Sequence, residues 1–206
     1  MPIPSKKLRL LIASASGVVA LLGGAAVGSW AVFVKHSDAG FVRSVSEVLP
    51  IPAAKIGSRM ILYRDFLKSR DTLRTFLSSD AAKEQAIDIP YDAQLERNVL
   101  EKLINQAAVE ELAEAQKVAV TDEELRAFFA DVVTAASTTT PDVGVYLLKN
   151  FGWNEEDFRQ HVLRPALLEQ RLAIAFAGQS QGDPNALAAY LSQRLTEKDV
   201  VRYLRF

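Results

Sequence analysis

Histidine is the side chain best suited to proton transfer near neutral pH, and this chain has two histidines and no cysteine. His36 follows a long apolar run, which predicts a position at an interface. His161 lies among charged residues on a predicted helix, which favours a solvated face. No Ser/His/Asp set has nucleophile-elbow spacing, and neither a P-loop nor a GxGxxG motif occurs. We therefore predict no catalytic and no cofactor-binding residue, and expect a protein that is not an enzyme.

Three consecutive acidic residues, Asp122, Glu123 and Glu124, come nearest to a metal-binding pattern. Thr121 precedes them, and a threonine followed three residues later by a glutamate is the capping box of a helix N-terminus. Carboxylates in a first helical turn are also stabilised by the helix dipole. We interpret the run as the start of a helix, and predict no metal site.

The composition is typical of a folded protein without a strong overall electrostatic field. Hydrophobic residues make up 49% of the chain and charged residues 24%, and the formal net charge is -1. That balance does not favour nucleic acid as a partner. Without cysteine there can be no disulfide, thiol catalysis, zinc–thiolate site or lipidated lipobox.

The N-terminal part contains an uncharged apolar run from Leu10 to Val34. A helix needs about 20 apolar residues to cross the hydrocarbon of a bilayer, so residues 10–34 are predicted to form a transmembrane signal-anchor helix. Lys6, Lys7 and Arg9 precede the run, and the positive-inside rule then keeps residues 1–9 in the cytoplasm. We expect a single-pass plasma-membrane protein whose main domain is extracytoplasmic.

Two other interpretations of this run stay open. Ala26-Val27-Gly28 is a passable cleavage site, although a cleaved signal peptide normally has an apolar core of about 7–15 residues and this run is longer. Gly24 and Gly28 form a GxxxG pair that could join two copies as a homodimer. Glycine is also common in membrane helices that do not associate.

Residues 35–52 are predicted to be a tether, and residues 53–206 to form one small helical domain. Around Ile56 to Ile61 a short extended piece with a tight turn at Gly57 is expected. The remaining breaks and the last short helix follow from turn residues and periodicity. We predict a loop or frayed helix end at 78–90, a loop at 136–144, a turn at 178–185 and a helix at 186–195.

The clearest helical pattern begins in "RNVLEKLINQAAVEELAEAQKVAVTDEEL", Arg97 to Leu125. A first helix is predicted to stop near Gln116, and a second to begin after the Thr121 cap, with Val120 and Leu125 placed for a hydrophobic staple. The apolar residues of the first helix fall on one stripe. They are Leu100, Leu103, Ile104, Ala107, Ala108, Leu112 and Ala115.

A second capping pattern occurs in the C-terminal half. Asn154 is the predicted cap and Asp157 the acidic third residue, with Trp153 and Phe158 as the staple pair. Pro165 lies inside the following helical pattern, where it lacks a backbone donor and crowds the preceding turn. It is expected either to kink this helix or to start a new one.

The final "KDVVRYLRF" alternates in the manner of a strand, with Val201, Tyr203 and Phe206 set against Arg202 and Arg205. It could pair with the extended piece near the start of the domain. The predicted fold is therefore mostly α, with a minor β element that pairs the two ends of the domain.

Three stretches resemble the SurA N-terminal domain, a family shared with PrsA-type periplasmic foldases. "KIGSRMILYRDF" resembles its glycine-centred first segment, and "GWNEEDFRQHVLRPALLEQRLA" a later helix. "VLEKLINQAAVEELAEAQKVAVTDEELRAFF" is similar to its signature helix and is the most specific of the three matches. Leu62 departs from the Ser or Thr that the family often has there.

The resemblance implies a membrane-anchored, extracytoplasmic chaperone-like protein that binds unfolded or newly exported polypeptides. Many relatives also carry a parvulin-type prolyl isomerase domain, and the stretch after Ala177 is too short for one. The alternatives are a non-enzymatic structural or adaptor subunit of an envelope complex, and an isomerase-related protein without its catalytic domain.

Binding unfolded chains requires exposed apolar surface beyond what the core uses. A groove between helices, lined by aromatic side chains, would accept such segments without reading their sequence. The candidate client-binding residues are Phe128, Phe129, Tyr146, Phe151, Trp153 and Phe176.

Overall fold

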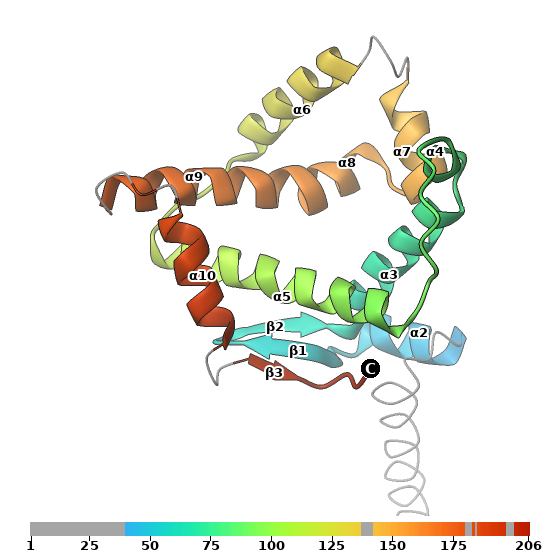
Figure 1. Ribbon diagram of the computed structural model, residues 1–206, viewed down its shortest axis with the longest axis horizontal. Coiled ribbons are helices and arrows are strands. Elements are labelled where there is room, and N and C mark those ends of the chain that lie inside the picture. The colour runs from blue at the N-terminus through green and yellow to red at the C-terminus, as the bar shows by residue number, and fades with distance from the viewer. Residues whose placement is uncertain (1–39, 137–141, 180–182, 184, 197–199) are drawn as a thin grey trace, which may run out of the picture.

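The computed structural model describes residues 40–136, 142–179, 183, 185–196 and 200–206 (Figure 1). These residues are mostly helical, with one small sheet. In chain order the elements are α2 (Gly40–Val48), β1 (Pro52–Ile56), β2 (Arg59–Leu62), α3 (Tyr63–Ser78), α4 (Asp80–Glu84), α5 (Ala93–Ala115), α6 (Asp122–Ala136), α7 (Val143–Phe151), α8 (Glu155–Phe158), the π-helix η1 (Arg159–Leu163), α9 (Arg164–Gln179), α10 (Ala186–Thr196) and β3 (Val200–Arg202).

None of the helices within these ranges is both long and apolar enough to cross a bilayer. The predicted anchor at 10–34, its Gly24 and Gly28 pair and the alternative cleavage site lie outside the described residues. His36 and the middle of the loop predicted at 136–144 also lie outside them.

The sheet is antiparallel, with β1 between β2 and β3. As predicted, β1 and β2 form a hairpin that turns at Gly57, whose φ is +52°. A Cβ at this position would lie 2.4 Å from the carboxylate oxygens of Glu111 on α5. Glycine is therefore favoured here by the left-handed turn, and a larger residue would also have to displace the carboxylate of Glu111.

The C-terminal strand joins the two ends of the fold as predicted, and the alternation of its residues does not show which side faces the core. Residues 200–202 of β3 pair with residues 54–56 of β1. Leu204 is buried, at 4% exposure, whereas Val201 is 42% exposed. Arg202 made the alternation misleading, because its guanidinium lies at 2.7 and 2.8 Å from the carboxylate of Glu101 on α5 and thus shares the inward side.

Two segments predicted to be irregular contain helices. The predicted tether at 35–52 includes α2, which packs on α3 through buried Val42 and Ser46. The predicted loop at 78–90 begins with α4, because the Ser79 hydroxyl accepts a hydrogen bond from the amide of Ala82 and caps it. Local capping and tertiary burial outweigh the weak periodicity of both segments.

α5 is the central helix of the fold (Figure 1). Leu100, Ile104, Ala108 and Leu112 of the predicted stripe are buried, whereas Leu103, Ala107 and Ala115 keep more exposure. α5 contacts the β1–β2 hairpin on one side and α9 on another, and α3 and α10 pack at its two ends. Because the sheet covers only one side of α5, a second side of this helix faces α8 and η1.

The predicted capping box of α6 is confirmed. The backbone N–H of Thr121 donates to the Glu124 carboxylate at 2.8 Å, and the amide of Glu124 donates to the Thr121 hydroxyl at 3.3 Å. The staple residues Val120 and Leu125 are both buried. Arg171 of α9 also donates to Glu124, and its guanidinium lowers the pKa of that carboxyl to about 2. α6 is thus fixed to α9 at its N-terminus.

The side of the C-terminal segment that faces the core can be tested by truncating one side chain on each side of it. Leu204→Ala removes a buried side chain and should lower the free energy of unfolding by about 2–4 kcal/mol. Val201→Ala, on the exposed side, should cost below about 1 kcal/mol. Urea unfolding of the full-length chain in detergent micelles, followed by far-ultraviolet circular dichroism, measures both. Equal losses of unfolding free energy, or a larger loss for Val201→Ala, would contradict the conclusion that the side of Leu204 faces the core.

Candidate binding groove

An apolar groove of about 530 Å³ lies between α3, α5 and the α8–η1 segment. Within the described part of the chain, no carboxylate lines this central groove, and its one lysine is Lys102. Such a volume and lining are typical of sites that bind apolar ligand groups. The apolar lining residues are Leu73, Phe76, Leu95, Val99, Leu103, Phe151, Trp153, Phe158 and Val162, and the polar ones are Ser69, Thr72, Asn98, Lys102, Gln106 and His161.

One wall of the central groove is a row of aromatic rings. Phe76 of α3 and Phe151 of α7 stack almost parallel, with ring centroids 5.1 Å apart. Trp153 follows at 5.9 Å from Phe151, and His161 at 6.1 Å from Trp153. The indole Nε1 of Trp153 is buried and has no hydrogen-bond acceptor among the described residues. The wall therefore combines broad apolar faces with one buried donor.

Two smaller hollows continue from the central groove. One, of about 420 Å³, lies between α2, α3 and the end of α7, and the other, of about 300 Å³, lies between β2, α3 and α5. Thr72 and Trp153 line all three spaces. Both smaller hollows are lined mostly by charged and polar side chains, so the surface becomes more polar from the central groove toward α2 and the sheet.

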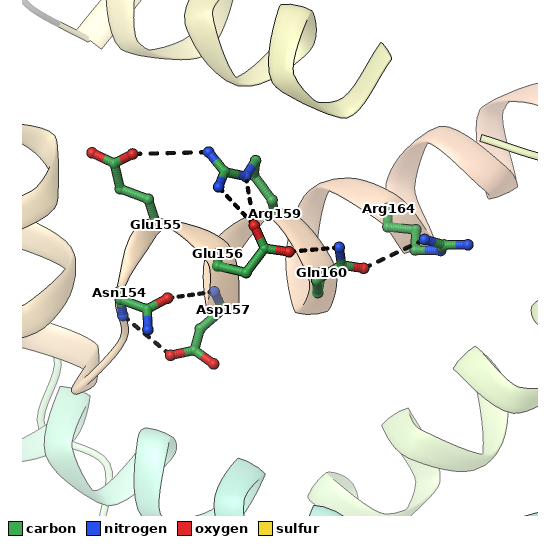
Figure 2. Close-up of polar contacts among 7 residues, drawn as sticks. All are labelled: Asn154, Glu155, Glu156, Asp157, Arg159, Gln160 and Arg164. Carbon is green, nitrogen blue, oxygen red and sulfur yellow. Dashed lines mark hydrogen bonds and ion pairs between the residues drawn. The ribbon is translucent and has the colours of Figure 1, made fainter. Parts of the chain in front are cut away.

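α8 is fixed at its start by the predicted capping box, which is confirmed. The Asn154 side chain accepts from the amide of Asp157 at 2.8 Å, and the Asp157 carboxylate accepts from the amide of Asn154 at 3.2 Å. Figure 2 shows this pair on the side of α8 toward α3, and Glu156 and Arg159 on the side toward α6. Arg159 donates to Glu156 at 2.6 Å, which adds a second local tie.

Pro165 is the second residue of α9 and follows a widened π-turn, so the helical run from α8 through η1 continues into α9 without the break that was one of the two expected outcomes. It lacks the N–H that would bond to the carbonyl of His161 in an α-helix, and its ring crowds that carbonyl. The amide of Arg164 instead bonds to the carbonyl of Arg159. The carbonyl of His161 accepts from the side-chain amide of Gln106 on α5, at 3.4 Å. The irregular turn thus provides a hydrogen-bond acceptor toward α5.

Lys68 bridges α3 to the opposite wall. Its ammonium lies 2.6 Å from Oδ1 of Asp157 and 3.2 Å from Nε2 of His161. An ammonium only donates, so His161 accepts here as the neutral ring protonated at Nδ1. Partial burial and then the Lys68 charge lower the pKa of His161, which favours this neutral form. Lys68 lowers the pKa of Asp157 and keeps that partner ionised.

The structure separates the six predicted client-binding residues. Phe151 and Trp153 line the groove, and Tyr146 lies behind Phe151 with ring centroids 6.2 Å apart. Phe129 is buried on the far side of α8, 6.2 Å from Phe158. The remaining two lie elsewhere on the surface. Phe128 is 36% exposed on α6, and Phe176 of α9 packs 5.4 Å from Tyr190 of α10.

Sequence reasoning missed the α3 and α5 walls of the groove. Phe76, Leu95 and Leu103 follow helical spacing and so predict burial in the core, yet each is only partly buried and lines the groove. His161, expected on a solvated face, is exposed but stands at the rim of the groove. No group of three or more metal-ligating side chains occurs among the residues that the structure describes.

Comparison with protein-family models matches residues 13–173 to the SurA-like N-terminal domain. The match covers the helices α3 to α8 that form the groove, and nothing in it corresponds to a parvulin domain. Comparisons with curated proteins and with solved structures found no match.

The Lys68–His161 contact predicts a pH dependence of stability. The lowered pKa of His161 means that its contribution is fully present above the unfolded-state value of about 6.5. This contribution is lost as pH falls through the lower folded-state pKa, because protonation removes the acceptor and places a second cation beside Lys68. The urea midpoint of the full-length chain should therefore fall on acidification below about pH 6.5.

Two histidine variants locate the cause of this pH dependence. His161→Gln should flatten the midpoint profile just below about pH 6.5, whereas His36→Gln, which removes the only other histidine, should leave it unchanged. A profile that keeps its acid slope in His161→Gln would contradict the assignment.

Proposed function

Because the chain belongs to the SurA-like N-terminal domain family, we propose that it is a chaperone-like protein that binds unfolded or newly exported polypeptides in the central groove. The observation that carries the proposal is the groove of about 530 Å³, open between three helical elements and lined by nine apolar side chains. Such a site offers burial to the apolar residues of an unfolded chain and discriminates little among their sequences.

The wall chemistry supports a polypeptide as the occupant. Aromatic faces and branched aliphatic side chains accommodate apolar residues of different shapes. The buried Nε1 of Trp153 is a donor that a backbone carbonyl of a bound chain could satisfy, and an unsatisfied buried donor costs about 1–3 kcal/mol. Lys102 adds a cation at the rim, so the groove would prefer segments that are not strongly basic.

The proposal places the protein at the outer face of the plasma membrane, attached through residues 10–34. Groove binding without sequence readout is expected to be weak, because buried area alone does not give high affinity. An anchor near the site where chains emerge would raise their effective concentration at the groove. We also propose that the chain acts without catalysis, since among the described groove residues neither the Ser69 nor the Thr72 hydroxyl is hydrogen-bonded to His161, whose ring nitrogen contacts Lys68 instead.

The holding function predicts that Leu103→Gln, in the groove wall, weakens suppression of the aggregation of an unfolded model protein. Full-length wild-type protein in vesicles should suppress the rise in light scattering that accompanies aggregation of the model protein. A several-fold higher concentration of the variant should be required for the same effect, because a polar amide replaces part of the apolar wall. Ile174→Gln is the matched control, since Ile174 lies on α9 outside the groove and is 68% exposed. Thermal unfolding of both variants checks that the fold is kept.

The outcomes separate the proposal from its rivals. Equal suppression by both variants would contradict the groove as the binding site. No suppression by the wild type at several-fold excess would favour a structural or adaptor subunit. Faster cis/trans isomerisation of a proline peptide, which normally takes tens of seconds or more, would instead revive the isomerase alternative.

A further inference from the structure

α2 presents two different faces. Val42 and Ser46 are buried against the body of the domain, and Arg43 pairs with Asp71 of α3 at 2.8 Å. On the adjoining flank, an apolar stripe consists of Phe41, Val48 and Leu49, which are 78%, 81% and 53% exposed. We call these three residues the α2 stripe.

The geometry of the α2 stripe indicates a contact surface. Its members recur at positions i, i+7 and i+8, which fall on one side of a helix, and partly buried Val45 at i+4 joins them. Exposed Glu47 lies on the opposite flank of the helix, whereas exposed Ser44 borders the stripe beside Val48. Single exposed apolar residues are ordinary, but an aligned set on a short helix marks a surface that is normally covered.

The sequence before α2 indicates what covers the stripe. The uncharged run ends at Val34, and α2 begins at Gly40. An extended chain covers at most about 3.5 Å per residue, so α2 begins within about 20 Å of the end of that run. If the run spans the bilayer, α2 cannot leave the vicinity of the lipid headgroups.

We propose that the α2 stripe inserts into the boundary between headgroups and acyl chains of the membrane that holds the anchor. This proposal rests on the membrane attachment included in the proposed function. An aromatic ring with aliphatic side chains on one flank and polar residues on the other is the composition of interfacial helices. The occupant is therefore a lipid surface, and the domain contacts it through residues that the core does not use.

Insertion of the α2 stripe would orient the groove. α2 is joined to α3 by the Arg43–Asp71 pair and by a hydrogen bond of 3.3 Å from Arg64 to the carbonyl of Glu47. The hollow of about 420 Å³ is lined by Arg43 and Glu47 of α2 and reaches Trp153 in the groove wall. Insertion of the stripe would therefore hold this hollow close to the membrane, on the side of α2 that faces away from the lipid, because Arg43 and Glu47 lie opposite the stripe.

The absence of cysteine permits a direct test with single-cysteine variants of the full-length chain. Each variant is labelled with an environment-sensitive fluorophore and placed in vesicles of phosphatidylcholine and phosphatidylglycerol. Val48→Cys reports the stripe, Glu47→Cys the polar flank of the same helix, and Val19→Cys the anchor run. Quenching is measured with aqueous iodide and with lipids that carry a nitroxide on the acyl chain.

The proposal predicts that the Val48 label is quenched at least several-fold more by nitroxide lipid than the Glu47 label, with the reverse order for iodide. The Val19 label should be quenched by nitroxide lipid alone. Iodide quenching of the Val48 label equal to that of the Glu47 label would overturn the proposal while leaving the anchor intact. Protection of the Val48 label from both quenchers would show a protein partner, such as a second copy, and would also overturn it.

Failure of the anchor remains distinguishable from failure of the holding function. Iodide quenching of the Val19 label would contradict membrane insertion, and with it the position proposed for the α2 stripe. Suppression of aggregation is measured separately with Leu103→Gln. Client binding in the groove can therefore be detected even if the α2 stripe does not insert into the membrane.

Discussion

The separation of α8–η1 from α3 and α5 is set by long polar side chains, and the groove depends on that separation. Lys68 reaches from α3 to Asp157 at 2.6 Å, and Gln106 reaches from α5 to the carbonyl of His161 at 3.4 Å. Helices packed through apolar side chains alone approach to about 8–10 Å between axes, which would close the space. The far side of α8 is held by Phe158 and Arg159 against Phe129.

Pro165 connects this spacing to the sequence. By removing one helical donor it produces the π-turn, and the turn provides the carbonyl that Gln106 reaches. The same turn presents His161 to Lys68, so one proline determines both contacts across the groove edge. In the proposed function, these contacts keep the apolar walls apart, while insertion of α2 would keep the hollow that adjoins the groove near the membrane.

Features set by neighbouring residues could be predicted from the sequence, and features set by distant ones could not. The caps at Thr121 and Asn154 were predictable because each is decided within four residues. The helix α2 was missed because its periodic residues are few and some of them face outward. The groove walls could not be predicted. Helical spacing shows that Leu103 lies on the apolar side of its helix, but it does not show whether another helix packs against that side chain. The C-terminal strand was predicted correctly, but the side of it that faces the core could not be predicted, because Glu101, the partner of Arg202, is distant in sequence.

Site-specific photo-cross-linking tests the central claim most directly. A photoreactive residue at Thr72, which lines the groove and both hollows, is compared with one at Phe128 on α6, outside them. Full-length protein in vesicles is irradiated with an unfolded model polypeptide. Groove binding predicts that the polypeptide cross-links at Thr72 far more than at Phe128. Equal cross-linking at the two positions, or a preference for Phe128, would contradict the account.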